Sequence, residues 1–194
     1  MSTPTHLPPP AAPSDDPVLA AALSALCTAT TARTGWAVAL DGDALRVAAA
    51  RGALADRARG LVVPVGGSAG FVAASGHPIA LAPRQGDAHV ADGVLGALGT
   101  VPTALLSLPC LVDGDVVGVV ELIDREDGGR FGFDDVELGT LLAAVVGAAL
   151  VHGDAAAADV PRPDRLVAQL VDLEHDDPVR YRRTAWAIQQ LLSS

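Results

Sequence analysis

One short motif in the chain has residue types and spacing that could perform nucleophilic catalysis. Gly66-Gly67-Ser68-Ala69-Gly70 follows the apolar run 61–65 and matches G-x-S-x-G, the pattern of a nucleophile elbow that exposes a reactive serine between a strand and a helix. Such a serine needs a histidine that accepts its proton and an acid that orients the histidine. Catalysis by Ser68 therefore requires both partners elsewhere in the chain.

The remainder of the chain does not favour catalysis by Ser68. Hydrolases with this elbow carry it on a mostly parallel sheet, with the acid and the histidine downstream, whereas the clearest strand signals here are antiparallel hairpins. The last two histidines are His152, at the end of an apolar helical pattern, and His175, in the acidic tail. We expect no catalytic residue, and we expect Ser68 to begin a helix whose glycines permit a tight turn and close packing.

No other stretch has the spacing of a phosphate or metal site. The glycines around Ser68 fit neither G-x-G-x-x-G nor the P-loop, whose lysine has no counterpart because the chain contains no lysine. The acidic segment 124–135 lacks the spacing of an EF-hand and reads as a solvated loop that ends in a helix cap. Neither His77 nor His89 has a partner at metal-ligand spacing, so we expect no metal.

Cys27 and Cys110 are the only cysteines, and they form no C-x-x-C motif. Their separation indicates neither a disulfide framework nor a zinc knuckle. Both fall in apolar patterns, where cysteine is most often a small buried side chain. A reducing compartment suits such a chain, so we expect a cytoplasmic protein.

Length and charge bound the function further. The chain has 194 residues, a formal net charge of -10 and only 3% aromatic residues, which fits one domain with a core of Ala, Val and Leu. Nucleic acid requires a clustered basic face, and an anionic membrane surface repels a negative chain, so we expect neither partner. The most apolar run, 138–151, is too short to span a bilayer.

The expected elements are helices alternating with antiparallel strand pairs. Asp16 before Pro17 is a helix start, and an Asp-Gly turn at 113–114 joins two apolar runs into a hairpin. A long helix that is apolar on most sides is expected from Asp134 to about Leu150. The strands are expected at 36–40, 44–48, 61–65, 79–82, 108–112 and 116–123, with a short helix at 90–98.

Composition also predicts the boundaries of the parts. The Pro-rich N-terminus and the Ala-rich stretch before Pro161 break the pattern of regular elements. We predict a disordered leader at 1–15, a domain at 16–152, a linker at 153–163 and a C-terminal helical hairpin at 164–194.

Three ordered motifs between Asp16 and Val151 resemble the GAF domain family. Residues 63–81 are similar to its strand, its glycine-punctuated helix G-x-x-G-x-V-A and the G-x-P that follows. Residues 107–125 resemble its hairpin, with a D-G turn and G-V-x-E-L. The segment from Phe131 to Leu138 is similar to the F-x-x-x-D-x-E-L opening of its last helix.

The resemblance implies an α+β, three-layer fold. It implies an antiparallel sheet of five to six strands, with the N- and C-terminal helices packed on one face and a ligand cavity on the other. Residues 83–104, named the roof segment below, would cover this cavity. The resemblance also implies that the first and last helices form a dimer bundle, and the apolar surface predicted for both helices favours the same interpretation.

Departures from the family's motifs argue against its known cofactors. Asp124-Arg125 stands where cyclic-nucleotide binders have N-K, and no histidine lies in 93–109, where haem-binding members usually carry theirs. The roof segment has no cysteine, which argues against bilin attachment and against the methionine sulfoxide reductases of the family. The motif residues therefore support neither cyclic nucleotide, haem nor bilin, and the cofactor stays unknown.

Two functions remain open, and an enzymatic function ranks third behind them. The first is a non-catalytic sensory module that binds a small, fairly apolar molecule and acts on a partner in trans, since no catalytic or DNA-binding domain follows the predicted linker. The alternative interpretation of each ligand candidate is ordinary core packing. The candidates are Trp36, Phe71, His89, Val94, Leu98, Thr103 and Ser107.

The second function is a ligand-free adaptor whose helices and C-terminal hairpin dock a partner protein. A homodimer is expected in both hypotheses, and the second one uses the amphipathic hairpin as its docking element. The candidates for the dimer or partner interface are Leu19, Leu23, Leu26, Leu142, Val146, Tyr181, Trp186, Ile188 and Leu192.

Overall fold

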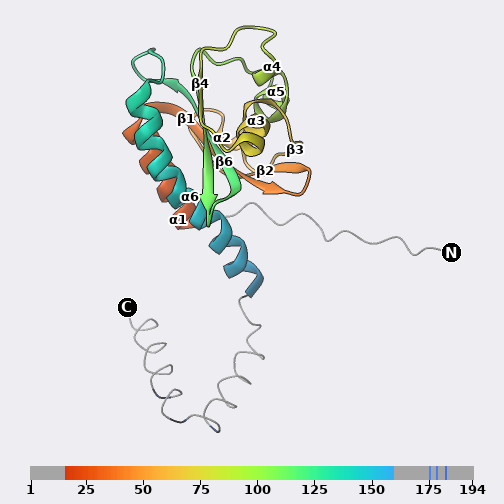
Figure 1. Cartoon of the computed structure of the whole chain (residues 1–194), viewed down its shortest axis with the longest axis vertical. Helices are drawn as coiled ribbons and strands as arrows, with labels where there is room; N and C mark the ends of the chain where they lie inside the picture. The colour runs from red at the N-terminus through yellow and green to blue at the C-terminus, as the bar shows by residue number, and fades with distance from the viewer. Residues whose placement is uncertain (1–15, 160–174, 176–177, 179–181, 183–194) are drawn as a thin grey trace, which may run out of the picture. The chain divides into compact units, whose positions relative to one another are not determined.

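The computed structural model of the chain describes residues 16–159 together with His175, Pro178 and Arg182. Six strands form one sheet in the order β3-β2-β1-β6-β5-β4, and all neighbours are antiparallel (Figure 1). This confirms the predicted sheet. The strands are β1 (Ala32–Asp41), β2 (Ala44–Arg51), β3 (Val62–Pro64), β4 (Ile79–Leu81), β5 (Leu105–Val112) and β6 (Asp115–Arg125).

The hairpin between β5 and β6 turns where the sequence predicts it. Asp113 has φ 52° and Gly114 has φ 93°, and both angles lie in the left-handed region that a two-residue hairpin turn of this type requires. Aspartate and glycine are among the residues that adopt this region most readily. The turn therefore fixes the register of β5 against β6.

Two helices cover one face of the sheet: α1 (Pro17–Ala29) and α6 (Phe133–Asp159) (Figure 1). The Asp16 side chain accepts hydrogen bonds from the amides of Val18 and Leu19, so the predicted N-cap is confirmed. We call the apolar layer beneath these helices the helix-side core. Its residues include Leu19, Leu23, Leu26, Ala37, Ala39, Leu106, Leu108, Val120, Leu122, Ala143 and Val146.

Small residues on α6 let it lie close to the sheet. A Cβ atom added at Gly139 would lie 2.7 Å from the Leu108 side chain, and one added at Gly147 would lie 3.2 Å from Cys110. Ala143 stands between them at helical spacing and is fully buried. One face of α6 therefore packs directly against β5.

Four short helices cover the opposite face: α2 (Ala55–Ala58), α3 (Gly67–Ser75), α4 (Ala88–Ala91) and α5 (Gly93–Leu98) (Figure 1). The helix predicted at 90–98 is in fact α4 and α5, because the chain is extended at Asp92 and has φ 70° at Gly93. Helix α2 was not predicted. The apolar layer here, the roof-side core, includes Trp36, Val38, Leu45, Val47, Val72, Val90, Val94, Leu95, Leu98 and Leu105.

The C-terminal part of the chain differs from the predicted boundaries in one respect. Helix α6 continues to Asp159, through the first residues of the linker expected at 153–163. The leader at 1–15 and most of the hairpin at 164–194 lie outside the described residues. Within the described part of the chain, none of the helices combines the length and hydropathy that a membrane crossing needs.

Candidate functional site

A buried polar cluster lies between the sheet and the roof-side helices. At its centre is Glu121 of β6, which is 1% exposed. Trp36 Nε1 donates to Glu121 Oε2 at 2.7 Å, and Ser107 Oγ donates to Oε1 at 3.3 Å. Ser68 Oγ also donates to Oε1. We call these four residues the Glu121 cluster.

Strand register brings three of the four residues together. Trp36 on β1 is the cross-strand partner of Glu121, and Ser107 on β5 is its partner on the other side. Side chains alternate across a strand, so all three point to the roof-side face. Glu121 therefore has a hydrogen-bond donor on each neighbouring strand.

Ser68 reaches the cluster because two glycines place the start of α3. Gly67 has φ 62°, and a Cβ atom there would lie 2.6 Å from the Asp92 carbonyl oxygen. Gly66 is extended, with φ -172°. The chain thus passes against the α4–α5 junction before α3 begins, and it leaves the Ser68 side chain pointing at the sheet.

Burial controls the electrostatics of the cluster. Desolvation raises the pKa of Glu121, and hydrogen bonds from Ser68, Trp36 and Ser107 oppose this shift only in part. The neutral acid is therefore favoured over a wider pH range than for an exposed glutamate. A neutral carboxyl group can both donate and accept a hydrogen bond, so it can pair with a polar group of either kind.

The surroundings of Ser68 differ from those of a nucleophile elbow. Its side chain is buried, and its acceptor is the carboxyl group of Glu121. No histidine is a hydrogen-bond partner of Ser68 among the described residues. As predicted, Ser68 belongs to the first turn of a helix, α3.

The seven predicted ligand residues fall in different environments. Trp36 and Ser107 belong to the Glu121 cluster, whereas Val94 and Leu98 are buried in the roof-side core. Thr103 lies at the exposed end of the roof segment, where its amide and its hydroxyl both donate to Asp124 Oδ1 at 2.7 Å. The structure therefore brings only two of the seven into direct contact with Glu121.

Phe71 and His89 form a separate contact near the surface. Their rings meet edge to face, with centroids 5.9 Å apart and an interplanar angle of 75°. Phe71 is 47% exposed, so it does not point into the roof-side core. Asp87 Oδ1 accepts from the His89 amide at 2.9 Å and lies 3.0 Å from its Nδ1, and these hydrogen bonds lower the pKa of Asp87.

Glu121 and Ser68 were not among the predicted ligand residues. The signal for Glu121 was available, because it is the only acid within the apolar run from Val116 to Ile123. An ionisable residue at an inward position of a central strand is rarely buried without a partner. Its partners could not be identified from the sequence, since they lie 14, 53 and 85 residues away.

The predicted interface residues on the two long helices are mostly interior. Leu19, Leu23, Leu26 and Val146 lie in the helix-side core, and Leu142 is partly buried against it. The exposed large apolar side chains of α6, among those that the structure describes, are different ones. They are Phe133, Leu138, Leu141, Val145 and Val151, of which Leu138, Leu141 and Val145 follow each other at helical spacing. Tyr181, Trp186, Ile188 and Leu192 lie outside the described residues.

Solved structures with the same fold come from several bacterial proteins. The GAF-B domain of DevS from Mycobacterium smegmatis is 17% identical with a TM-score of 0.56, over 71% of this chain and 93% of that one. The GAF domain of a phosphoenolpyruvate-protein phosphotransferase from Coxiella burnetii is 23% identical with a TM-score of 0.58, over 76% and 89%. A free methionine-R-sulfoxide reductase from Neisseria meningitidis is 20% identical with a TM-score of 0.55, over 71% and 78%.

The sequence comparison agrees with this likeness in fold. No curated protein matches the chain. The family profile of the GAF domain, in contrast, matches residues 16–150, which is more than half of the chain. The protein therefore belongs to the GAF domain family, whose members are mostly sensory and regulatory.

Proposed function

We propose that this domain is a non-catalytic sensory module that binds a small molecule beneath the roof segment, at the Glu121 cluster, and signals through its long helices. The observation that carries the proposal is the fully buried carboxyl group that accepts three hydrogen bonds between the sheet and α3. The ligand we propose is small and largely apolar, with one polar group that pairs with Glu121.

The energetic cost of the cluster supports a binding role. Burying a carboxyl group is unfavourable, and well-packed apolar residues of similar volume often give an equally stable or a more stable core. A role in ligand binding would explain why a carboxyl group is buried here despite this cost. The covering elements α4 and α5 have only four and six residues, so opening the roof segment disrupts little regular structure.

The thiols of the domain support a non-catalytic role. Burial raises the pKa of Cys27 to about 11 and the pKa of Cys110 to about 12, so both thiols carry almost no thiolate at neutral pH. Both cysteines are free and buried, as suits a protein of a reducing compartment such as the cytoplasm.

The exposed face of α6 supports a role in association. Leu138, Leu141 and Val145 are 42%, 69% and 50% exposed and follow each other at spacings of three and four residues. We propose that this apolar stripe pairs with a second copy of the chain, which would couple the sensing domain to a helical dimer.

Native mass spectrometry and tryptophan fluorescence test the binding role. The chain has two tryptophans, so Trp186→Phe leaves Trp36 as the only reporter, bonded directly to Glu121. We expect a molecule that copurifies with the protein to change Trp36 emission and to be lost in Glu121→Gln. Ligand-free protein whose Trp36 emission does not respond to a metabolite library would contradict the proposal.

Light scattering after size exclusion tests the association role. Leu141→Glu places a charge in the middle of the exposed stripe without disturbing the core, and we expect it to convert a dimer to a monomer. Val62 is 53% exposed on β3, so Val62→Glu is the matched control. A wild-type monomer, or equal loss of the dimer in both variants, would contradict the proposed interface.

The second candidate is a ligand-free adaptor that docks a partner protein. The roof-side core favours it, because Trp36, Val94, Leu95 and Leu98 fill the space beneath the roof segment and are each less than 10% exposed. In this case the purified protein carries no small molecule but captures a partner, and removal of residues 160–194 abolishes the capture.

A further inference from the structure

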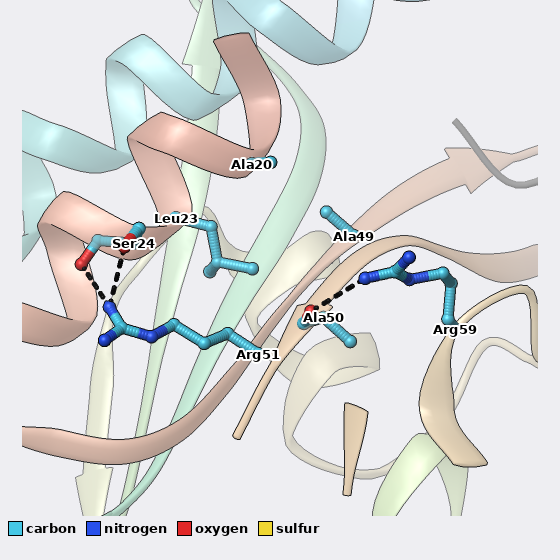
Figure 2. Close-up of a pocket in the computed structure, with 7 residues that line it drawn as sticks. All are labelled: Ala20, Leu23, Ser24, Ala49, Ala50, Arg51 and Arg59. Carbon is cyan, nitrogen blue, oxygen red and sulfur yellow. Dashed lines mark hydrogen bonds between the residues drawn. The ribbon is translucent and has the colours of Figure 1, made fainter. Parts of the chain in front are cut away.

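In the described part of the chain, strand β2 is left uncovered along part of its length, and a pocket lies beside it. Strand β3 pairs with β2 only from Ala44 to Arg46, and Val47 then bonds to the backbone at Gly60 and Leu61. Beyond Val47, β2 has no further strand neighbour on this side among the described residues. A pocket of about 290 Å³ lies between this part of β2 and α1 (Figure 2).

The lining of this pocket combines apolar and cationic groups. Helix α1 and strand β2 contribute small and apolar side chains, and two arginines stand at the sides (Figure 2). Among the residues that the structure describes, no acidic side chain lines the pocket, although the chain as a whole has a net charge of -10. The lining residues are Ala20, Leu23, Ser24, Ala49, Ala50, Arg51 and Arg59.

Both guanidinium groups have N–H donors that are not used in their hydrogen bonds to the described residues. Arg51 uses Nη1 for the carbonyl and hydroxyl oxygens of Ser24, both at 2.8 Å, and for Thr28 Oγ1 at 3.4 Å. Arg59 makes one long bond, from Nη2 to the Ala50 carbonyl oxygen at 3.5 Å. Within the described residues, neither arginine is paired with a carboxylate, and the remaining nitrogens of both have no acceptor.

Such donors match a planar or tetrahedral oxyanion. Guanidinium groups bind carboxylate and phosphate oxygens through paired N–H donors, and they stay charged at every physiological pH. The volume lies near the lower end of the range for ligand pockets, roughly 300–1,000 Å³, which fits a small metabolite and not a large cofactor.

We propose that this pocket binds a small organic oxyanion, a carboxylate or a phosphate, between Arg51 and Arg59. The short apolar part of the ligand lies on Ala20, Leu23 and Ala49. The site is separate from the Glu121 cluster, because it lies at the sheet edge beside α1 and not beneath the roof segment. A bound anion contacts α1 and β2 together, and thus the helix that packs beside α6.

Three simple probes test the chemistry. The full chain is titrated at low ionic strength with butyrate, with inorganic phosphate and with butyramide, the neutral counterpart of butyrate, while backbone amide shifts are followed by NMR. We expect an anion to shift the amides of Ser24, Ala50 and Arg51, and butyramide to leave them unchanged. Stronger binding of butyrate points to a carboxylate ligand, and stronger binding of phosphate points to a phosphate ester.

Two variants and a control test the residues. Arg59→Gln removes an exposed side chain with one long hydrogen bond, so the fold is preserved, and we expect binding to weaken about tenfold. Arg51→Lys keeps the charge but loses the paired donors, and we expect a smaller loss. Arg130 is an exposed arginine outside the pocket, so Arg130→Gln is the matched control and should bind as the wild type does.

Three results would overturn the proposal. The first is the absence of any shift at the pocket with either anion at millimolar concentration. The second is binding of butyramide as strong as that of butyrate. The third is an equal weakening of anion binding in Arg59→Gln and Arg130→Gln. This result would mean that binding depends on the total charge of the protein and not on the pocket.

Discussion

Trp36 and Glu121 are directly opposed on neighbouring strands, and the indole Nε1 donates to Glu121 Oε2 at 2.7 Å in the interior of the protein. Trp36 is 0% exposed and Glu121 is 1% exposed. Neither partner is in contact with bulk water in the folded protein. The stability of the domain should depend on the ionisation of Glu121 and on each of its donors.

The first prediction concerns pH. Burial raises the pKa of Glu121 above its ordinary value of 4.5, so above that pH the folded protein keeps a proton that the unfolded chain has released. Stability should then fall as pH rises from 4.5 to the folded-state pKa, by up to about 1.4 kcal/mol per pH unit. Glu121→Gln should lack this fall. Urea unfolding of both proteins across this range measures it, and parallel stability curves would exclude the shift.

The second prediction concerns the two serines. Ser68→Ala removes a buried donor to Oε1 and should lower the free energy of unfolding by about 1–3 kcal/mol. Ser107→Ala is the matched comparison and should cost less, because its bond to the same oxygen is longer, at 3.3 Å. Chemical denaturation of both variants checks the order. A more damaging Ser107→Ala would mean that Ser68 is not the principal donor.

The third prediction concerns the entry into α3. Gly67→Ala should be strongly destabilising for two reasons. Alanine in the left-handed conformation costs about 1–2 kcal/mol, and its Cβ would lie 2.6 Å from the Asp92 carbonyl oxygen. Gly86 also has positive φ but has nothing within 4 Å of the added Cβ, so Gly86→Ala reports the strain alone. Thermal unfolding should rank Gly67→Ala well below Gly86→Ala, and equal melting temperatures would contradict the close approach.

The fourth prediction concerns the thiols. Burial raises the pKa values of Cys27 and Cys110 to about 11 and about 12, and the thiolate is the reactive form. Labelling by a thiol reagent near neutral pH should therefore proceed only as fast as the fold opens, and both thiols should react at once in denaturant. Rapid labelling of one native thiol would show that its surroundings are more open than the structure describes.

Local signals in the sequence predicted most of the fold. The Asp16 cap and the Asp113-Gly114 turn were predicted because each depends on residues within a few positions of one another. The break between α4 and α5 was missed because Asp92 and Gly93 lie in a run with helical spacing, and the backbone of Gly66 and Gly67 that packs against them is distant in sequence.

The candidate site was predicted less completely, for two physical reasons. Hydrogen bonds to Glu121 depend on the register of strands that are far apart in the chain, which no local pattern encodes. Phe71 was expected to line a cavity because the fold implied by the resemblance to GAF domains would point it there. On α3, however, Ser68, Ala69 and Val72 share the inward face, and Phe71 points away from them.

Strand β1 sends Trp36 into the roof-side core and the next residue, Ala37, into the helix-side core. Glu121 and Leu122 on β6 divide in the same way, with Glu121 at the polar cluster and Leu122 in the helix-side core. On each of these strands a single peptide unit thus separates the proposed binding site on the roof side from the helix-side core, on which α1 and α6 pack. A displacement of Trp36 that its own side chain does not absorb can therefore reach the helices through the backbone of β1, or through Glu121 and the backbone of β6.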